Sequence, residues 1–495
     1  MKRNLMSLRG KAWFAPAMAA GVLLLASCAQ DGYDDDERWT SSVTNTALES
    51  PDASDITIEA STDGSKTVIS WNVVYGAGGY YCSVYNVSDE DNPVVVDEVE
   101  NELVDGCSLA VTREEDNNYL FCIRTAGNDE LNNTEATTTT EVEFNSFTET
   151  YATIPAGSDL AEWFSENPVP TDIDDDTDLC YDLEPGGEYT LSESIDFLNS
   201  EVTLRTTSQT EHAKVTFTGT DVSIKTGAGM TIKYIDFDCS TSLEPFIMLS
   251  ETPDESLLGA TGTGDYYNIQ SAITVNGCEI EGLNYGFIHD NSVKYCLETL
   301  LINNCVVHLT ISSTANPDQH AVIYMYTGFA NDLTIQNSTF WNSGDSDCKY
   351  FVQYSNSGRC SRAGYTQNSV NYLNSTFYKL AYEGQWGNYS AFAGQSSSYW
   401  VMTDNIFVDC GSGQVPRRFL AGRTNVTTAT FANNTYMYDG EFESTNGSVE
   451  YYDDSGTAIE EDPQFADPDN GDFTVGGSAQ IEKQTGDPRW LPSEE

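Results

Sequence analysis

A short unit recurs along the second half of this sequence, and it restricts the possible folds more than any other feature. Its plainest copies read NSTFW at Asn337–Trp341 and NSTFY at Asn374–Tyr378. In general form the unit is an apolar residue, any residue, an Asn, two further residues and an aromatic or apolar residue. Such a unit predicts a solenoid, because insertions between coils change the repeat length while the coil itself stays the same.

The Asn position of the unit can be followed through six copies. The intervals are 27, 33, 37, 30 and 29 residues, between Gly277, Asn304, Asn337, Asn374, Asp404 and Asn433. Asn, Asp and Gly tolerate left-handed backbone angles, so the unit describes two short strands that meet at a bend. We expect the last five positions to lie in register along one edge, with consecutive members within about 10 Å. We also expect their side chains to hydrogen-bond from coil to coil.

A second set of apolar segments also occurs once per coil. Its members are Phe246–Leu249, Ala321–Tyr324, Phe351–Gln353, Ala391–Ala393 and Phe419–Ala421. Two strand sets with one period predict an all-β fold in which residues 147–495 form a parallel β-helix.

The two ends of this region carry a family resemblance. Leu183–Leu191 resembles the opening coil of pectate-lyase-like right-handed parallel β-helices, Asp462–Val475 their closing segment and Gly486–Trp490 a frequent tail. The chain is similar to surface lipoproteins encoded beside pectin-degradation systems, whose β-helix families are uncharacterised. The resemblance implies a plant-type acidic polysaccharide (pectin or polygalacturonate) as partner, together with other glycan-utilisation proteins.

Residues 55–146 show a different pattern of short alternating strands between turns. Thr67–Trp71, Ala77–Tyr80 and Tyr119–Ala126 each place apolar residues on one face. The early Trp, the AxxY entry and the later YxFxIxxA resemble, in that order, a fibronectin type III sandwich. The resemblance implies a spacer or docking module, because such a domain has no catalytic requirement.

The N-terminus has the pattern of a targeting segment. A basic stretch, Lys2–Lys11, precedes an apolar run that is too short for a membrane span, and Leu25–Cys28 resembles a lipobox. The resemblance implies a signal peptide at 1–27, lipidation of Cys28 and an acidic tether at 28–54. Within the tether, Asp31–Glu37 resembles the export tag of Bacteroides-type surface lipoproteins, which implies an outer-membrane lipid anchor facing the cell exterior. The alternative is a solvated tether that holds whichever way the protein faces.

The charge of the chain excludes one class of partner. There are 22 Lys and Arg against 77 Asp and Glu, a formal net charge of −55. Residues 1–27 hold four of the basic residues and no acidic one, so the remainder carries −59. Such a surface repels nucleic acid, which we therefore do not expect as a partner.

One segment departs from this acidity. Between Asp345 and Asn425 there are seven basic residues against five acidic ones, among many aromatics. Guanidinium groups pair with carboxylates and flat rings stack on sugar faces, so this segment is a candidate groove for a uronic-acid polysaccharide. The alternative is that these residues pair with local acids and line loops. The candidate glycan-binding residues are Lys349, Arg359, Arg362, Trp386, Arg417, Arg418 and Arg423. We expect Arg417 and Arg418 on a strand, pointing to opposite sides.

Contiguous catalytic signatures are missing from the sequence. There is no G-x-S-x-G, the four histidines lack metal-ligand spacing, and the Gly-His-Gly of β-helix polygalacturonases is absent. The nearest string to the Arg-x-Pro-x-x-Arg of pectate lyases, Gln414–Phe419, has both arginine positions wrong. Catalytic residues are therefore unassigned.

Asp172–Asp178 could supply oxygen ligands to Ca²⁺, or it is an acidic linker. Three function classes stay open: a glycan-binding protein, a Ca²⁺-dependent lyase, and a scaffold or adhesin.

The cysteines add two expectations. Twelve cysteines less a lipidated Cys28 leave eleven, so at least one is unpaired. Cys278 and Cys305 occupy one core position in successive coils and are expected as stacked buried thiols. Cys348 and Cys360 bracket a short excursion and could form a disulfide in an oxidising compartment.

Overall fold

The computed structural model describes residues 43–61, 66–89, 92–114, 116–171, 178–259, 264–395, 397–422, 428–442 and 452–492. The predicted signal peptide, Cys28, the first part of the tether, residues 172–177 of the acidic stretch and Arg423 lie outside these ranges. The chain divides into two compact units, Met1–Phe147 and Thr148–Glu495. Among the described residues, no helix is long and apolar enough to span a bilayer.

The first unit contains two antiparallel sheets around one core. Strand order in the smaller sheet is β1-β2-β6, and in the larger it is β4-β3-β7-β8 with β5 beside β3. The alternation of buried and exposed residues along β2 and β7 is the predicted one, and it buries Trp71, Tyr80 and Phe121 together. The elements are η1 (Ala53–Asp55), β1 (Ile56–Ala60), β2 (Lys66–Trp71), β3 (Tyr80–Asn86), β4 (Val94–Val95), β5 (Glu102–Val104), β6 (Ser108–Thr112), β7 (Asn118–Thr125), η2 (Asp129–Leu131) and β8 (Thr140–Asn145).

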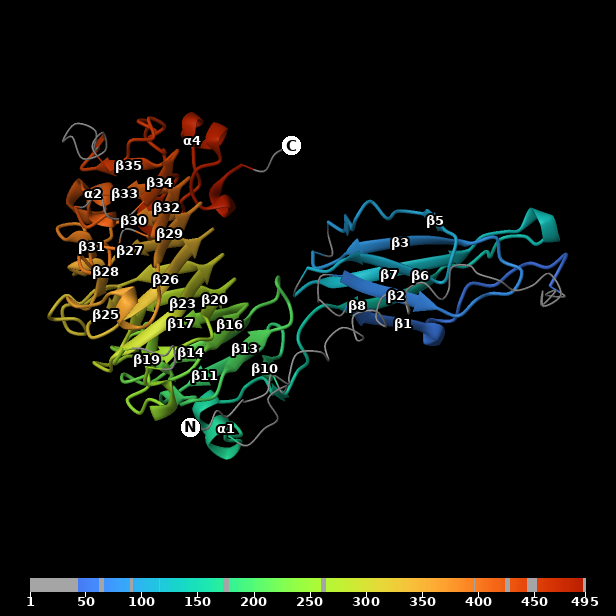
Figure 1. Ribbon diagram of the computed structural model, residues 1–495, viewed down its shortest axis with the longest axis horizontal. Coiled ribbons are helices and arrows are strands. Elements are labelled where there is room, and N and C mark those ends of the chain that lie inside the picture. Colours follow the sequence, from blue (N-terminus) through green and yellow to red (C-terminus); the bar gives the residue numbers. More distant parts are fainter. Residues whose placement is uncertain are drawn as a thin grey trace, which may run out of the picture. The chain divides into compact units, whose positions relative to one another are not determined.

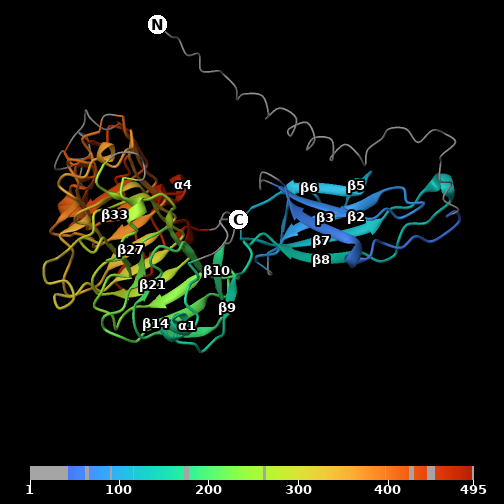
Figure 2. The same cartoon turned by 60° about the horizontal axis from the view of Figure 1, so that its bottom comes forward.

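The second unit is built from three sheets whose strands are parallel, apart from the terminal pair β35–β36 (Figures 1 and 2). Successive turns of the chain add their strands to these sheets in sequence order, which is the arrangement of a parallel β-helix. The first sheet contains β9 (Ala152–Ile154), β10 (Leu179–Leu183), β13 (Val202–Thr206), β16 (Met230–Lys233), β20 (Ile273–Asn276), β23 (Tyr295–Asn303), β26 (Phe329–Gln336), β29 (Ser369–Leu373), β32 (Tyr399–Thr403) and β34 (Thr428–Ala432), with β19 (Tyr267–Ile269) beside β23.

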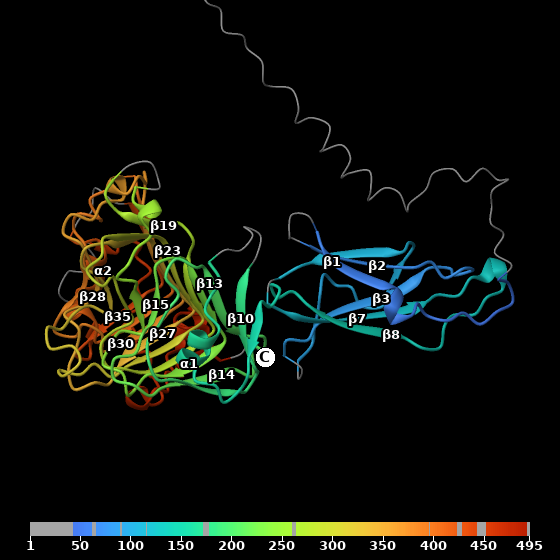
Figure 3. The ribbon, with the colours of Figure 1, turned by 90° about the horizontal axis from the view of Figure 1, so that it is seen from below.

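The other two sheets form the remaining sides of the coil, and Figure 3 shows strands of all three around one interior. The second contains β11 (Glu188–Leu191), β14 (Ala213–Phe217), β17 (Ile235–Asp238), β21 (Glu279–Leu283), β24 (Val306–Leu309), β27 (Thr339–Asn342), β30 (Thr376–Tyr378), β33 (Ile406–Val408), β35 (Thr435–Tyr438) and β36 (Glu441–Phe442). The third contains β12 (Ile195–Asp196), β15 (Ile224–Thr226), β18 (Ile247–Leu249), β22 (Ile288–His289), β25 (Ile323–Met325), β28 (Tyr350–Tyr354) and β31 (Gln385–Asn388). One continuous apolar core fills the interior.

Short helices occur between the strands of this unit. They are α1 (Leu160–Glu166), η3 (Glu255–Leu257), η4 (Cys360–Arg362), η5 (Gly411–Gly413), α2 (Val415–Phe419), η7 (Pro468–Asn470), α4 (Ser478–Lys483) and η8 (Pro488–Trp490). The predicted strands at Ala391–Ala393 and Phe419–Ala421 are therefore wrong. The third sheet uses β31 in the first of these coils, and α2 follows in the next.

The predicted bend between the first and second sheets is confirmed. All five positions have left-handed backbone angles, with φ between 45° and 59°, at Asn304, Asn337, Asn374, Asp404 and Asn433. The strands that lead into them are in register, and the first four bend N–H groups donate to carbonyls of the next coil. The N–H of Asn433 donates instead to Thr457 Oγ1 at 2.9 Å. Asn or Asp, which tolerate left-handed backbone angles, thus occupy the same corner in successive coils.

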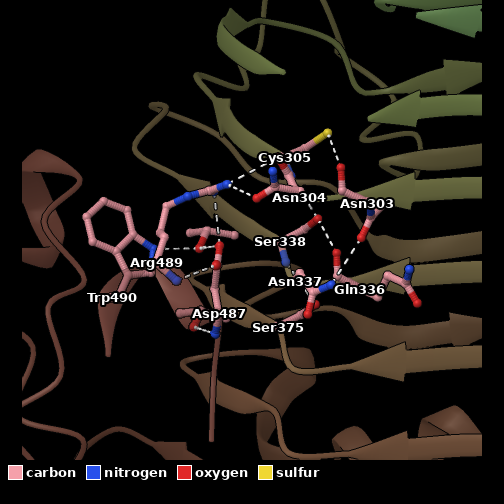
Figure 4. Close-up of polar contacts among 12 residues, drawn as sticks. Asn303, Asn304, Cys305, Gln336, Asn337, Ser338, Ser375, Asp487, Arg489 and Trp490 are labelled. Atoms are coloured by element: carbon pink, nitrogen blue, oxygen red, sulfur yellow. Dashed lines mark hydrogen bonds and ion pairs between the residues drawn. The ribbon is translucent and has the colours of Figure 1, made fainter. Parts of the chain in front are cut away.

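The coil-to-coil ladder of side chains runs mainly through the residue after the bend. Buried polar side chains accept backbone N–H groups of the preceding coil in an unbroken series of 3.0–3.2 Å contacts. The first two run from Cys305 N to Ser338 Oγ and from Ser338 N to Ser375 Oγ (Figure 4). The next two run from Ser375 N to Asn405 Oδ1 and from Asn405 N to Asn434 Oδ1. Of the bend residues themselves, Asn433 and Asp404 bond to each other at 2.8 Å. The predicted ladder is correct in kind but displaced by one residue, because the inner position is where buried backbone groups need partners.

The cysteines of this unit are thiols. Cys278 and Cys305 are both fully buried and follow the in-register strands β20 and β23, as predicted. Cys348 and Cys360 are also buried, and no disulfide joins them in the described structure, so the bridge that the sequence allowed is not formed.

The C-terminal segment packs on the outside of the second sheet. Trp490 Nε1 donates to Thr339 Oγ1 at 2.8 Å, and the buried Asp487 carboxylate accepts from the same hydroxyl at 2.8 Å. Arg489 donates to the side chain and carbonyl of Asn304 at 2.7 and 3.1 Å (Figure 4). Phe473 and its neighbours form a small separate core against Trp341. This segment makes one wall of the site described next.

Candidate functional site

Two hollows lie on the outer face of the second sheet, of about 890 and 510 Å³. They meet, because Trp341, Ser343 and Asp469 line both. Together they run from the coil of β21 to the coil of β33, which at about 4.8 Å per coil is roughly 20 Å. We name this feature the groove. Its length suits a chain-like ligand better than a single small molecule.

The larger hollow is lined mainly by acidic and polar groups. Its carboxylates are Asp345, Asp347, Glu383, Asp409 and Asp469, and its cations are Lys349 and Lys379. Lys379 is engaged by Asp469 at 2.7 Å, which also accepts from Tyr378 at 3.0 Å. Of the two cations in the hollow, Lys349 is the one that makes no ion pair with another described residue.

Asp347 forms the base of the larger hollow. Its carboxylate accepts the backbone N–H groups of Cys348, Ala381 and Tyr382, so it ties two neighbouring coils together. Burial raises the pKa of this carboxyl to about 6, although those three donors act in the opposite direction. Its role here is to hold the loops that shape the hollow.

A hydroxyl, an imidazole and a carboxylate are connected in series where the hollows meet. Ser343 Oγ lies 2.8 Å from His308 Nε2, and His308 Nδ1 lies 2.5 Å from Glu281 Oε2. The His308 ring stacks on Trp341 with centroids 3.6 Å apart and planes 3° apart. With Nδ1 protonated toward Glu281, Nε2 is left as an acceptor for the serine hydroxyl.

Local backbone features position each of the three groups. The register between β21 and β24 shifts so that Glu281 and Gly282 face His308, and such a bulge redirects a side chain. Gly282 has φ of +76°, and a Cβ there would lie 2.8 Å from the Cα of Ser240. The sheet therefore requires glycine at this position to present Glu281.

The serine sits on an equally constrained turn. Asn342 Oδ1 accepts from the N–H groups of Gly344 and Ile311 at 3.0 and 3.2 Å, and its amide donates to Ser346 O at 3.0 Å. A Cβ on Gly344 would lie 2.1 Å from the Ile311 carbonyl oxygen. Ser343 is exposed while its backbone is fixed.

The aromatic part of the predicted glycan site is wrong. Trp386 is fully buried and stacks on Phe351 at 4.2 Å, inside the solenoid. Tyr354, Tyr389 and Trp400 from the same segment are also buried in the core. Aromatic rings of this segment were expected to stack on sugar faces, but wide coils need large side chains to fill their interior.

The arginine pair is also placed differently from the prediction. Arg417 and Arg418 lie on α2, not on a strand, and Pro416 in its first turn is the sequence signal that could have shown this. Arg417 is exposed and donates to Gln414 Oε1 at 2.9 Å. Burial lowers the pKa of the half-buried Arg418, which interacts electrostatically with Tyr350.

Lys349 shares a neighbour with this pair. Its Nζ lies 5.7 Å from the centre of the Tyr350 ring, at the start of β28. The coils of β28, β31 and α2 follow one another, since Gln385 N donates to Lys349 O and α2 packs on β31. Lys349, Arg417 and Arg418 make no ion pair with any other described residue, and we name these three the cationic rim.

The remaining predicted residues do not join the cationic rim in the described structure. Arg359 and Arg362 are exposed at η4. The pKa of the loop carboxyl Asp265 is lowered mainly by its hydrogen bond from Lys294, and the charge of Arg362 adds to this effect. Arg423 lies outside the described residues. Within the described ranges, no group of three or more His, Cys, Asp or Glu side chains is arranged to hold a metal ion.

Comparison with known proteins gives families without an assigned function. A domain of unknown function, DUF4992, matches residues 1–186, DUF4957 matches 187–343 and DUF5123 matches 333–490. No curated protein matches the sequence. Among solved structures, the crystal structure of pectate lyase PelI from Erwinia chrysanthemi in complex with tetragalacturonic acid aligns at 10% identity, over 58% of this chain and 85% of that chain, with a TM-score of 0.14. A TM-score of this size supports no inference about fold or function.

Proposed function

We propose that the protein binds an acidic polysaccharide of the pectin or polygalacturonate class along the outside of its solenoid, as part of a glycan-utilisation system. The observation that carries this proposal is the cationic rim. In a chain with a net charge of −55, three neighbouring cations have no acidic partner among the described residues. Cations without internal partners are suited to the carboxylates of a ligand.

The groove supplies a second kind of contact beside the rim. Lys349 belongs to both, since it lines the larger hollow. Carboxylates such as Asp345 and Glu383 accept hydrogen bonds from sugar hydroxyls, while guanidinium and ammonium groups bind uronate carboxylates. A polyuronate can therefore place its carboxylates on the rim and its hydroxyls in the groove.

The double variant Lys349→Ala/Arg418→Ala is expected to bind polygalacturonate about tenfold more weakly than the unchanged protein, since each exposed or half-exposed charge pair contributes up to about 1 kcal/mol. Binding by the unchanged protein should also weaken as salt is raised, because such pairing is screened. Isothermal titration calorimetry at two salt concentrations measures both effects.

Lys214→Ala, which removes an exposed lysine on β14, is the matched control and should keep full affinity. Neutral galactan should bind less tightly than polygalacturonate at either salt concentration. Equal affinity for the two glycans, or full affinity in the double variant, would contradict the proposal.

We also propose that Cys28 carries a lipid that anchors the protein in the outer membrane, facing the exterior. Cys28→Ser should move the protein from the membrane fraction to the soluble fraction, because one lipid-bearing residue is the anchor that the sequence predicts. Fractionation with immunoblotting measures this, and protease accessibility on whole cells tests the outward orientation. Unchanged membrane retention in the variant would rule out the predicted lipidation site.

We also propose that the first unit is a fibronectin type III-like module and that the second is a right-handed β-helix. The pairing of β1, β2 and β6 in one sheet, and of β3, β7 and β8 in the other, supports a fibronectin type III-like spacer or docking module. A right-handed solenoid is supported by the general rule that parallel crossover connections are right-handed.

A Ca²⁺-dependent lyase is the alternative function for the groove. Ultraviolet absorbance of unsaturated product from polygalacturonate, measured with and without Ca²⁺, distinguishes a lyase from a protein that only binds the glycan. A scaffold or adhesin would bind neither glycan.

A further inference from the structure

We infer that Ser343, His308 and Glu281 form an acyl-hydrolase site, and that its substrate is a short O-acyl ester on a carbohydrate chain. The 2.8 Å Ser343–His308 contact and the 2.5 Å His308–Glu281 contact connect a nucleophile, a general base and an orienting carboxylate in the order that acyl transfer requires. The three residues come from three successive coils, so the solenoid itself brings them together.

The surroundings distinguish this arrangement from an ordinary surface hydrogen bond. His308 cannot swing away freely, because Trp341 stacks on its ring while hydrogen bonds engage both ring nitrogens. His212 offers an internal comparison: its Nδ1 contacts Asp236 at 2.8 Å, but its Nε2 faces the backbone carbonyl of Gln209 at 3.1 Å. Of these two imidazole–carboxylate pairs, the one in the groove presents Nε2 to a hydroxyl.

The reaction can be written in two balanced steps. A lone pair of Ser343 Oγ attacks the ester carbonyl carbon while His308 Nε2 takes the hydroxyl proton, and His308 then gives that proton to the departing sugar oxygen as the ester C–O bond breaks. Water repeats the attack on the acyl-Ser343, again losing its proton to His308. The bond to Oγ breaks, Oγ regains the proton, and the carboxylic acid leaves. Glu281 stays ionised and orients the ring, so it is a positioning residue.

The groove indicates the class of substrate. Ser343 is exposed where the two hollows join, so an acyl group can occupy one side while the chain that bears it continues along the other. The groove extends over roughly 20 Å and is lined by polar groups, which suits a hydroxyl-rich polymer. The identity of that polymer as a carbohydrate rests on the proposed function.

The test uses the full-length protein and two substrates. We expect a fluorophosphonate probe to label the unchanged protein on the Ser343 tryptic peptide. We also expect p-nitrophenyl acetate hydrolysis and acetate release from O-acetylated pectin. Ser343→Ala should abolish labelling and lower both hydrolysis rates at least about 100-fold. Ser361→Ala, which removes an exposed serine on η4 outside both hollows, and His212→Gln should leave both unchanged.

The role of Glu281 has its own readout. Glu281→Gln should lower kcat about 100-fold with KM unchanged, and Glu281→Asp should restore part of kcat, because a shorter carboxylate still orients the ring. A merely structural residue would instead change thermal stability, which circular dichroism measures for the same variants.

Failure of this inference is separable from failure of the proposed function. De-esterified polygalacturonate carries no acyl group, so its binding should be the same in Ser343→Ala as in the unchanged protein. No labelling and no hydrolysis in the unchanged protein, or full activity in Ser343→Ala, would overturn the hydrolase site whatever the binding result. Hydrolysis of p-nitrophenyl acetate without acetate release from pectin would overturn the assigned substrate.

Discussion

Arg205→Met is expected to lower the free energy of unfolding of the solenoid by about 3–5 kcal/mol, because it leaves a buried carboxylate without its charge partner. Arg205 and Asp182 are register partners in the first sheet, and their side chains are 1% and 8% exposed. Arg205 Nε donates to Asp182 Oδ1 at 2.8 Å, and its Nη2 donates to Thr148 O at 2.6 Å. Urea unfolding followed by Trp fluorescence measures the change.

Two further variants make this result specific to the buried pair. Arg205→Met/Asp182→Leu should recover a large part of the lost stability, because removing both charges removes the uncompensated one. Lys379→Met breaks the exposed pair with Asp469 and should cost at most about 1 kcal/mol. Equal losses in Arg205→Met and Lys379→Met would show that burial does not determine the effect.

Asn405→Ala is expected to cost about 3 kcal/mol, because several buried backbone groups each lose a hydrogen bond at once. Asn405 Oδ1 accepts from Ser375 N at 3.1 Å, and its Nδ2 donates to the carbonyls of Tyr372 and Thr403, each at 2.8 Å. The removed side chain connects neighbouring coils, so the loss should be seen as faster amide exchange in β29 and β32 by hydrogen–deuterium exchange mass spectrometry.

Asn371→Ala is the matched control in a neighbouring coil. Its half-buried side chain makes one bond, to Thr334 Oγ1 at 3.1 Å, and should cost about 0.5–1 kcal/mol. If the two alanine variants lose equal stability, the buried ladder is not a principal source of cohesion between coils.

The bends could be predicted because their signal is local. Asn374 must adopt a left-handed conformation whatever its distant neighbours are, and that requirement restricts the residue type directly. The buried ladder was displaced by one residue in the prediction for a different reason. Whether Asn374 or Ser375 faces the neighbouring coil depends on the direction of the side chain after the bend, which a periodic pattern does not contain.

The site could not be predicted in the same way. Glu281 and His308 are separated by 27 residues, and His308 and Ser343 by 35, and these intervals are set by loop insertions. A search for a contiguous signature such as G-x-S-x-G cannot detect residues that meet only across coils. Aligning the coils on their bend residues places His308 and Trp341 side by side, and this alignment is the signal from which the histidine could have been found.

The C-terminal segment has a consequence for how the chain is made. Arg489 contacts Asn304 across 185 residues of sequence, and Trp490 contacts Thr339 across 151. During synthesis the middle coils exist before residues 469–490 emerge, so the smaller hollow lacks a wall until this segment has been made. A product cut short before Asp469 would keep most coils but have no complete groove. Assembly of the groove is thereby coupled to synthesis of this C-terminal segment, and molecules that lack the segment have an incomplete groove.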